Sequence, residues 1–226
     1  MRVGILEAGP LPEDLQPRYG RYGDLFRALL AGRGFEFAVW RAHDGELPAS
    51  VDAAEAWIVT GSRHAVYEDH PWLPGLEALT RAAHAERRPM AGLCFGHQLM
   101  AKALGGRVEK SPKGWGIGVH EWDAGGAPLR LVAAHQDQVV EVPPGARVTA
   151  ASAFCPVAAL EWPDAPMLAW QGHPEFDAGF ARALIETRRG GAYPEALADE
   201  ALATLDAPLD REAVAARIAA LFREAC

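Results

Sequence analysis

The stretch AGLCFGHQLM, residues 91–100, decides the fold because it places one cysteine, Cys94, at the junction of a strand and a helix. The apolar run PMAGL before Cys94 is typical of a buried strand, and FGHQLMAKAL after it has the spacing of a helix. Gly92 and Gly96 permit a tight turn and close backbone approach. The pattern predicts a nucleophile elbow, in which a sharp strand-to-helix turn exposes a reactive side chain.

The predicted helix start supplies chemistry that a reactive cysteine needs. Its free N–H groups and positive potential favour the thiolate form of Cys94. The N–H of Phe95 is then a candidate donor to an oxyanion formed on a substrate. Gln98 lies one helical turn after the cysteine, from where its amide can reach a bound substrate. From this local pattern alone, a buried and inert cysteine remains the better interpretation.

A second stretch, WQGHPEF at residues 170–176, supplies the groups that complete a cysteine nucleophile. Pro174 disfavours a helix and favours an extended path, in which His173 and Glu175 face the same side. Glu175 can therefore hold the imidazole of His173 while its other nitrogen faces a thiol. A His-Pro-Glu tripeptide alone is usually an ordinary loop. The cysteine stretch and the His-Pro-Glu stretch together, each at the end of a predicted strand, favour a catalytic role instead.

Outward from these stretches, strands and helices alternate through the first half of the chain. Strand patterns cover residues 2–8, 35–42, 54–61 and 89–94, and helix patterns cover residues 22–34, 76–86 and 95–106. This alternation predicts right-handed crossovers and a mostly parallel sheet covered on both faces. After residue 106, short strand patterns separated by Pro, Gly and Asp predict an antiparallel extension.

Helix patterns return after Pro174, at residues 176–189, 193–205 and 210–225. The last has Asp210 as its predicted N-cap and an apolar face made of Val214, Ile218, Leu221 and Phe222. The predicted fold class is therefore α/β, with a mostly parallel central sheet flanked by helices, a small antiparallel extension and a helical C-terminal tail.

Composition narrows the functional classes. The net charge of −8 argues against binding a nucleic-acid backbone or an anionic membrane surface, and no apolar run reaches the roughly 18–20 residues that span a bilayer. Three widely spaced cysteines predict reduced thiols and a cytoplasmic protein. The H-E-x-x-H and C-x-x-C motifs of metal sites and the Walker motif of ATP sites are absent. GWGIG superficially resembles a dinucleotide-binding fingerprint, but it is followed by a strand pattern where that fingerprint needs a helix. We therefore expect no metal and no cofactor.

With both stretches considered, the sequence is similar to the class I (triad) glutamine amidotransferases over roughly residues 1–187. GLCFGHQ resembles the family's elbow, and WQGHPE resembles the stretch that carries its other two triad members. AHQDQV at 134–139 resembles the family's H-x-D-x-V segment, and FCPVAAL resembles its S-x-P-[apolar]-A strand, which implies a structural role for Cys155. We expect residues 1–190 to form an amidotransferase-like domain, with residues 191–226 as a helical extension packed on it.

The resemblance implies roles for individual residues. Cys94 would be the nucleophile, His173 the general base and acid, and Glu175 the group that orients the imidazole. Phe95 and Gly61 would supply the oxyanion donors. Around Gly61 this chain departs from the family, because Gly61-Ser62 stands where a G-G-P-x-S-like loop is usual.

The implied reaction is hydrolysis of the γ-amide of glutamine through a γ-glutamyl thioester. Residues 188–226 are too few for an ATP-using synthetase, so the chain resembles a stand-alone version of the glutaminase part of GMP synthase, acting alone or with an ammonia-accepting synthetase in trans. One alternative is a γ-glutamyl peptidase, which cleaves other γ-glutamyl amides or peptides. Another is a binding or regulatory module with weak turnover.

Overall fold

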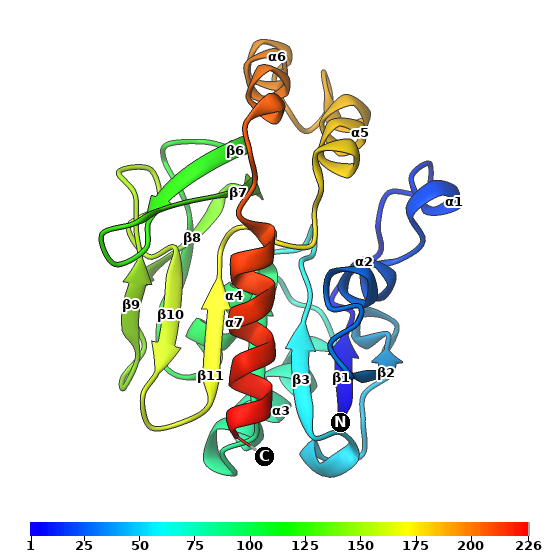
Figure 1. Ribbon diagram of the computed structural model, residues 1–226, viewed down its shortest axis with the longest axis vertical. Helices are drawn as coiled ribbons and strands as arrows, with labels where there is room; N and C mark the ends of the chain where they lie inside the picture. Colours follow the sequence, from blue (N-terminus) through cyan, green and yellow to red (C-terminus); the bar gives the residue numbers. More distant parts are fainter. Residues whose placement is uncertain (226) are drawn as a thin grey trace.

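A seven-stranded sheet forms the centre of the computed structural model, which describes residues 1–225 (Figure 1). Its strand order is β2-β1-β3-β4-β11-β10-β9. The parallel strands are β1 (Arg2–Leu6), β2 (Glu36–Trp40), β3 (Ala56–Val59), β4 (Met90–Leu93) and β11 (Met167–Trp170). Beyond β11, β10 (Ala159–Trp162) runs antiparallel to both β11 and β9 (Arg147–Ala150). The predicted α/β class with a mostly parallel sheet is confirmed.

Helices cover both faces of this sheet, because successive strand residues alternate between the two sides. Ile58 of β3 belongs to a core cluster that includes side chains of α2, α5 and α7, whereas its neighbours Trp57 and Val59 belong to a second cluster with α3 and α4. The helices are α1 (Gln16–Tyr19), α2 (Tyr22–Leu29), α3 (Leu73–Ala85), α4 (Phe95–Ala103), α5 (Ala178–Arg188), α6 (Glu195–Ala203) and α7 (Arg211–Glu224). Among residues 1–225, no helix has the length and hydrophobicity that a membrane crossing requires.

The antiparallel extension consists of two small sheets. One pairs β6 (Gly116–Asp123) with β7 (Pro128–His135), and the other pairs β5 (Arg107–Lys110) with β8 (Asp137–Glu141). The sequence did not predict β5, because its four residues RVEK are mostly exposed and carry no apolar run. The extension connects to the main sheet through a bridge between Val132 and His173, which brings it next to the predicted site.

The C-terminal helix α7 packs against the central sheet, in front of it in Figure 1. Its buried side chains are Val214, Ala215, Ile218, Ala219 and Phe222, and Leu221 is partly buried. Asp210 occupies the predicted N-cap position of α7, but its side chain makes no capping hydrogen bond. The Asp210 carboxylate accepts a hydrogen bond from the N–H of Arg130 (2.7 Å), because the chain before α7 runs beside β7 and the N–H of Asp210 donates to the carbonyl of Arg130 (2.8 Å). The predicted boundary at residue 190 stays a prediction.

Replacing Phe222 by Ala tests whether α7 completes the core. Phe222 is fully buried and packs edge-on against Phe35, at 5.9 Å between ring centroids. Phe222→Ala should lower the unfolding free energy by about 3–5 kcal/mol, and the melting temperature by roughly 6–20 °C. Thermal denaturation measures the change, with Ala216→Ser on the exposed face of α7 as the matched control. Equal melting temperatures for the two variants would contradict this role of α7.

Candidate active site

Cys94 occupies a strained turn between β4 and α4. Its backbone has φ 52° and ψ −100°, a conformation that residues with side chains rarely adopt. A Cβ atom at Gly92 would lie 2.5 Å from the carbonyl oxygen of Gly96, and one at Gly96 would lie 2.3 Å from that of Val59. The N–H of Cys94 donates to the carbonyl of Trp170 (2.8 Å). The two glycines therefore let α4 start directly against β3, and the thiol is presented at the end of the sheet.

His173 and Glu175 lie together in a buried pair. His173 Nδ1 and Glu175 Oε1 are 2.8 Å apart, and both side chains are almost fully buried. The imidazole stacks on the ring of Phe176, with centroids 4.0 Å apart and planes at 4°. The N–H of His173 donates to the carbonyl of Val132 (2.9 Å), which ties this segment to β7. Three contacts from three directions thus fix the orientation of the ring.

The protonation of His173 follows from its neighbours. Burial by itself lowers the pKa of His173, but the charges of Cys94 and Glu175 and the hydrogen bond with Glu175 outweigh burial and raise that pKa to about 10. The other ring nitrogen, Nε2, is buried and has no partner at hydrogen-bond distance among the described residues. A protonated imidazole that is influenced by a nearby thiol has the arrangement that a general acid requires.

Arg211, at the start of α7, supports the segment that carries His173 and Glu175. Its guanidinium donates to the carbonyls of Pro174 (2.7 Å) and Glu175 (3.2 Å). The sequence offered no signal for this contact, because a single arginine at a helix start, far along the chain, has no recognisable pattern. The tail therefore holds the His173–Glu175 segment in place as well as covering the sheet.

Gly61 approaches the pair from the end of β3. A Cβ atom there would lie 3.0 Å from Cε1 of His173, so a side chain at this position would press on the ring. The adjacent hydroxyls hold the turn: Thr60 accepts from the N–H of Ala8 (3.1 Å), and Ser62 donates to the carbonyl of Ala8 (2.8 Å). Within residues 1–225, the N–H of Gly61 donates to no other group. Its assignment as an oxyanion donor, and that of Phe95 at the first position of α4, stay predictions.

A cavity of about 580 Å³ opens above Cys94 and Gln98. Residues from five segments line it: 10–16, 62–68, 110–115, 134–137 and 187–192. The side-chain amide nitrogen of Gln98 already donates to the carbonyl of Asp137 (2.9 Å) and to Oε1 of Gln171 (3.1 Å). Gln98 therefore braces the cavity floor with its NH₂ group and has only its carbonyl oxygen for a substrate. Another hollow of about 590 Å³, between β9 and α7, is lined by none of the predicted site residues.

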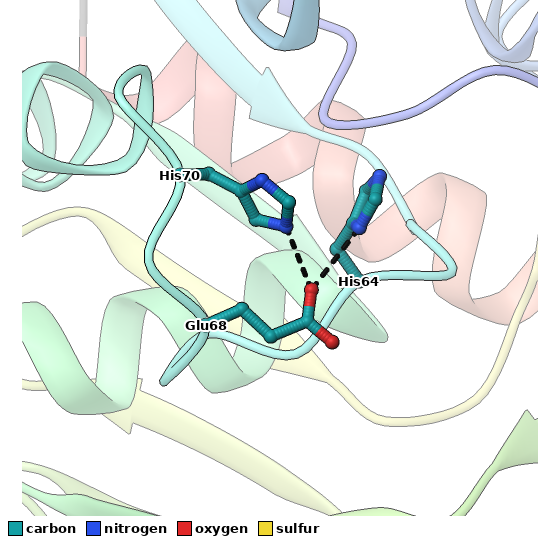
Figure 2. Close-up of side chains that lie close together, drawn as sticks. All are labelled: His64, Glu68 and His70. Carbon is teal, nitrogen blue, oxygen red and sulfur yellow. Dashed lines mark hydrogen bonds and ion pairs between the residues drawn. The ribbon is translucent and has the colours of Figure 1, made fainter.

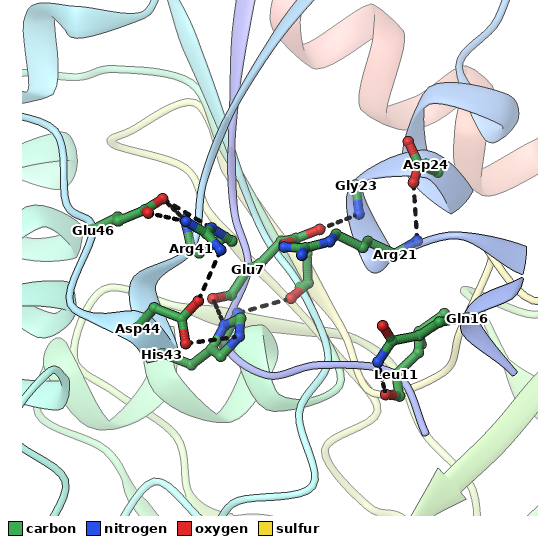
Figure 3. Close-up of polar contacts among 12 residues, drawn as sticks. Glu7, Leu11, Gln16, Arg21, Gly23, Asp24, Arg41, His43, Asp44 and Glu46 are labelled. Atoms are coloured by element: carbon green, nitrogen blue, oxygen red, sulfur yellow. Dashed lines mark hydrogen bonds and ion pairs between the residues drawn. The ribbon is translucent and has the colours of Figure 1, made fainter. Parts of the chain in front are cut away.

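One wall of the cavity, residues 10–16, is held at both ends (Figure 3). Before the wall, the buried carboxylate of Glu7 accepts from the N–H of Gly23 (2.8 Å) at the start of α2. His43 Nδ1 lies 2.9 Å from the backbone carbonyl of Glu7. At its end, the amide of Gln16 donates to the carbonyl of Leu11 (2.9 Å). These contacts give a segment with little regular structure a defined path beside Cys94.

His64, Glu68 and His70 form a cluster that the sequence did not predict (Figure 2). His64 Nδ1 and His70 Nε2 lie 3.1 and 2.7 Å from the same oxygen, Oε2 of Glu68. Of the residues described, these are the one group of three His, Cys, Asp or Glu side chains whose ligand atoms gather within 4.8 Å. The carboxylate accepts from both partly exposed rings, and His70 also stacks on Trp72. These contacts account for the geometry of the cluster without an ion.

Comparison with known proteins agrees with the geometry. The model of the family described as "Glutamine amidotransferase class-I" matches residues 26–187. "Gamma-glutamyl peptidase 4" of Arabidopsis thaliana is 29% identical over 216 residues, which cover 88% of this chain and 86% of that protein. A "GMP synthase [glutamine-hydrolyzing]" of Lachnospira eligens is 35% identical over 126 residues, 52% of this chain and 23% of that protein.

The fold is shared as well. The crystal structure of a "glutamine amido transferase" from Methylobacillus flagellatus has a TM-score of 0.78 to this chain at 28% sequence identity, and the match covers 99% of this chain and 94% of that one. The similarity therefore extends over the whole chain, including the helices that follow Glu175.

Alkylation should distinguish the described cysteines. Cys94 lines the cavity, whereas Cys155 is fully buried, and burial raises the pKa of its thiol to about 12. Iodoacetamide should therefore label Cys94 much faster than Cys155, because the thiolate is the reacting form. Peptide mass spectrometry measures both rates, in a Cys226→Ser background because Cys226 lies outside the described residues. Equal, slow labelling of both cysteines would contradict a reactive Cys94.

Proposed function

The chain belongs to the class-I glutamine amidotransferase family, and on that premise we propose that it hydrolyses the γ-amide bond of γ-glutamyl compounds through a thioester on Cys94. The observation that carries the proposal is the set of contacts around His173. The ring is held by Glu175, its pKa is raised by Cys94 and Glu175, and Cys94 in turn lines a cavity. Nucleophile, acid-base group and orienting carboxylate are the parts that thiol-dependent amide hydrolysis needs.

In the first half of the reaction, the Cys94 sulfur attacks the γ-carbonyl carbon of the substrate. The carbonyl electron pair moves onto oxygen, and the N–H groups of Phe95 and Gly61 stabilise the resulting charge. One such donor contributes roughly 10²–10³ to the rate. The C–N bond then breaks as His173 gives its Nε2 proton to the departing nitrogen. The products are a free amine, or ammonia from glutamine, and a γ-glutamyl thioester.

In the second half, water attacks the thioester carbon and His173 takes a proton from that water. The C–S bond breaks, glutamate leaves, and the Cys94 thiolate beside the protonated His173 is restored. Each cycle consumes one water molecule and needs no oxidant or cofactor. Throughout, Glu175 keeps Nδ1 of the ring occupied, so that Nε2 is the nitrogen that exchanges protons.

Among γ-glutamyl compounds, we favour γ-glutamyl peptides as the substrate over free glutamine. The relative named γ-glutamyl peptidase aligns over most of both chains, whereas the GMP synthase match takes in 23% of that protein. The cavity of about 580 Å³ also falls within the roughly 300–1,000 Å³ that holds drug-sized ligands, so it has room beyond a glutamyl group.

The second candidate is a glutaminase that passes ammonia to a synthetase in trans. The 35% identity to a glutamine-hydrolysing synthase supports it, because the shared segment includes about half of this chain. A partner chain would then have to supply the ATP-dependent step. The two candidates share the chemistry at Cys94 and differ in what is released when the thioester forms, an amino acid or peptide in the first and ammonia in the second.

Glutamate release from a substrate panel decides between the candidates. γ-Glutamyl dipeptides should be hydrolysed faster than glutamine, and Cys94→Ala should abolish both activities because the attacking sulfur is gone. Cys226→Ser serves as the matched control for losing a thiol and should keep full activity. Hydrolysis of glutamine alone would favour the ammonia donor. Cleavage of neither substrate would contradict the proposal and favour a binding or regulatory module with weak turnover.

Glu175→Gln tests the orienting carboxylate. The raised pKa of His173 means that the acid form persists at neutral pH and is lost only as the pH rises through about 10. Wild-type kcat/KM should therefore fall on the alkaline side near that value. In the variant, one of the charges that raise the pKa is absent, so the fall should move to lower pH, and kcat should drop by roughly 10²–10⁴. An unchanged pH profile with unchanged kcat would remove Glu175 from the triad.

A further inference from the structure

Arg188, at the end of α5, lines the same cavity as Cys94. Its guanidinium donates to the hydroxyl of Tyr193 (2.8 Å) and lies 5.5 Å from the centre of the Tyr193 ring. No carboxylate of residues 1–225 forms an ion pair with it. The next residue, Arg189, lies on the outside and makes a two-pronged bond to Asp199, at 2.8 Å for both contacts. Of these two adjacent arginines, Arg189 has a carboxylate partner and Arg188 has none among the described residues.

The phenols around Arg188 supply no negative charge at neutral pH, and of the described groups Cys94, in its thiolate form, also acts on the guanidinium. Burial raises the pKa of the phenols of Tyr22 and Tyr193 above the ordinary value, so both rings stay neutral. Arg188 is partly buried, and a charged side chain held partly away from bulk water without a carboxylate partner is costly to the folded state. A guanidinium kept in that condition at the wall of a reaction cavity is prepared to bind an anion. Its planar fork matches a carboxylate in particular.

The other groups that line the cavity indicate which carboxylate of a substrate Arg188 would bind. Lys110 of β5 and Asp137 of β8 are register partners, and both line the cavity next to Gln98. This pair offers one positive and one negative group, which match the α-carboxylate and α-ammonium of a glutamyl group. Arg188 reaches the same cavity from another element, α5, which Figure 1 shows apart from β8. A substrate held by its glutamyl end at Lys110 and Asp137 then leaves Arg188 available for its other end.

We propose that Arg188 binds the C-terminal carboxylate of the leaving group, which makes γ-glutamyl amino acids and peptides the preferred substrates over glutamine and uncharged γ-glutamyl amides. The inference rests on the proposed function and defines its substrate class. Tyr193 keeps the guanidinium in place through its hydroxyl, and Trp115, edge-on to Tyr193 at 5.0 Å, adds an apolar wall beside the leaving group. Arg188 touches the part of the substrate that leaves and takes no proton itself.

Two substrates that differ only at the far end test this assignment. γ-Glutamylglycine ends in a carboxylate, and γ-glutamylglycinamide replaces it with an uncharged amide of the same size. The wild type should favour the first. Arg188→Met should lower kcat/KM for γ-glutamylglycine by roughly 10- to 100-fold, mainly through KM, and leave the glycinamide almost unchanged. Arg188→Lys should recover part of the loss, because it keeps the charge without the fork.

Arg189→Met is the matched control, since it removes an arginine paired on the outside of the protein, and it should change neither substrate. Melting temperatures check that all variants fold. Equal losses on both substrates in Arg188→Met, or no loss on either, would overturn the assignment of Arg188 while leaving the proposed function intact.

Binding separates a failure of this inference from a failure of the proposed function. Calorimetry on Cys94→Ala protein measures the affinity for γ-glutamylglycine without turnover. Adding Arg188→Met should weaken that affinity by the same roughly 10- to 100-fold and spare the glycinamide. If the wild type hydrolyses neither compound yet this difference in affinity persists, the carboxylate site stands and the hydrolytic function falls. If the affinities for both compounds are insensitive to Arg188, the carboxylate site falls.

Discussion

The close packing of α4 against β3 is the constraint on which the rest of the site depends. Gly96 lies so near the carbonyl of Val59 that no side chain fits between them, and Gly92 lies equally near Gly96. This contact forces Cys94 into a conformation that costs of the order of 1–3 kcal/mol for a residue with a side chain. The buried strands on either side and the hydrogen bond from Cys94 to Trp170 stabilise the turn. The result is a thiol at the end of a rigid sheet.

The His173–Glu175 pair depends on parts of the chain that lie far apart in sequence. His173 follows β11, but its orientation comes from β7 through Val132 and from the stacked ring of Phe176. Arg211 then ties the carbonyls on either side of Glu175 to the start of α7. The geometry of the His173–Glu175 pair and the stability of the C-terminal helix are therefore coupled, because the same helix buries Phe222 in the core and holds the loop that carries the pair.

Local charge and overall charge differ in this protein. The chain carries a net charge of −8, yet the cavity contains Arg188 without a carboxylate partner among the described residues. A cavity concentrates the field of the few groups that line it, so the sign of the whole chain says little about what it binds. The same reasoning separates Arg188 from Arg189: identical side chains, one residue apart, face a reaction cavity and a surface carboxylate.

The sequence alone determined the α/β class, the central strands and the elbow at Cys94, because these follow from local periodicity and from glycines at fixed spacing. The pairing of His173 with Glu175 was also within its reach, since Pro174 imposes an extended path on two neighbouring residues. It placed Asp210 at the N-cap of α7 but not the partner of its carboxylate, did not predict β5, and offered no signal for Arg211, the His64–Glu68–His70 cluster or Arg188. Those features depend on which segments meet after folding. Whether an arginine finds a carboxylate, a carbonyl or an open cavity is set by the packing of distant elements, and only the tertiary structure decides it.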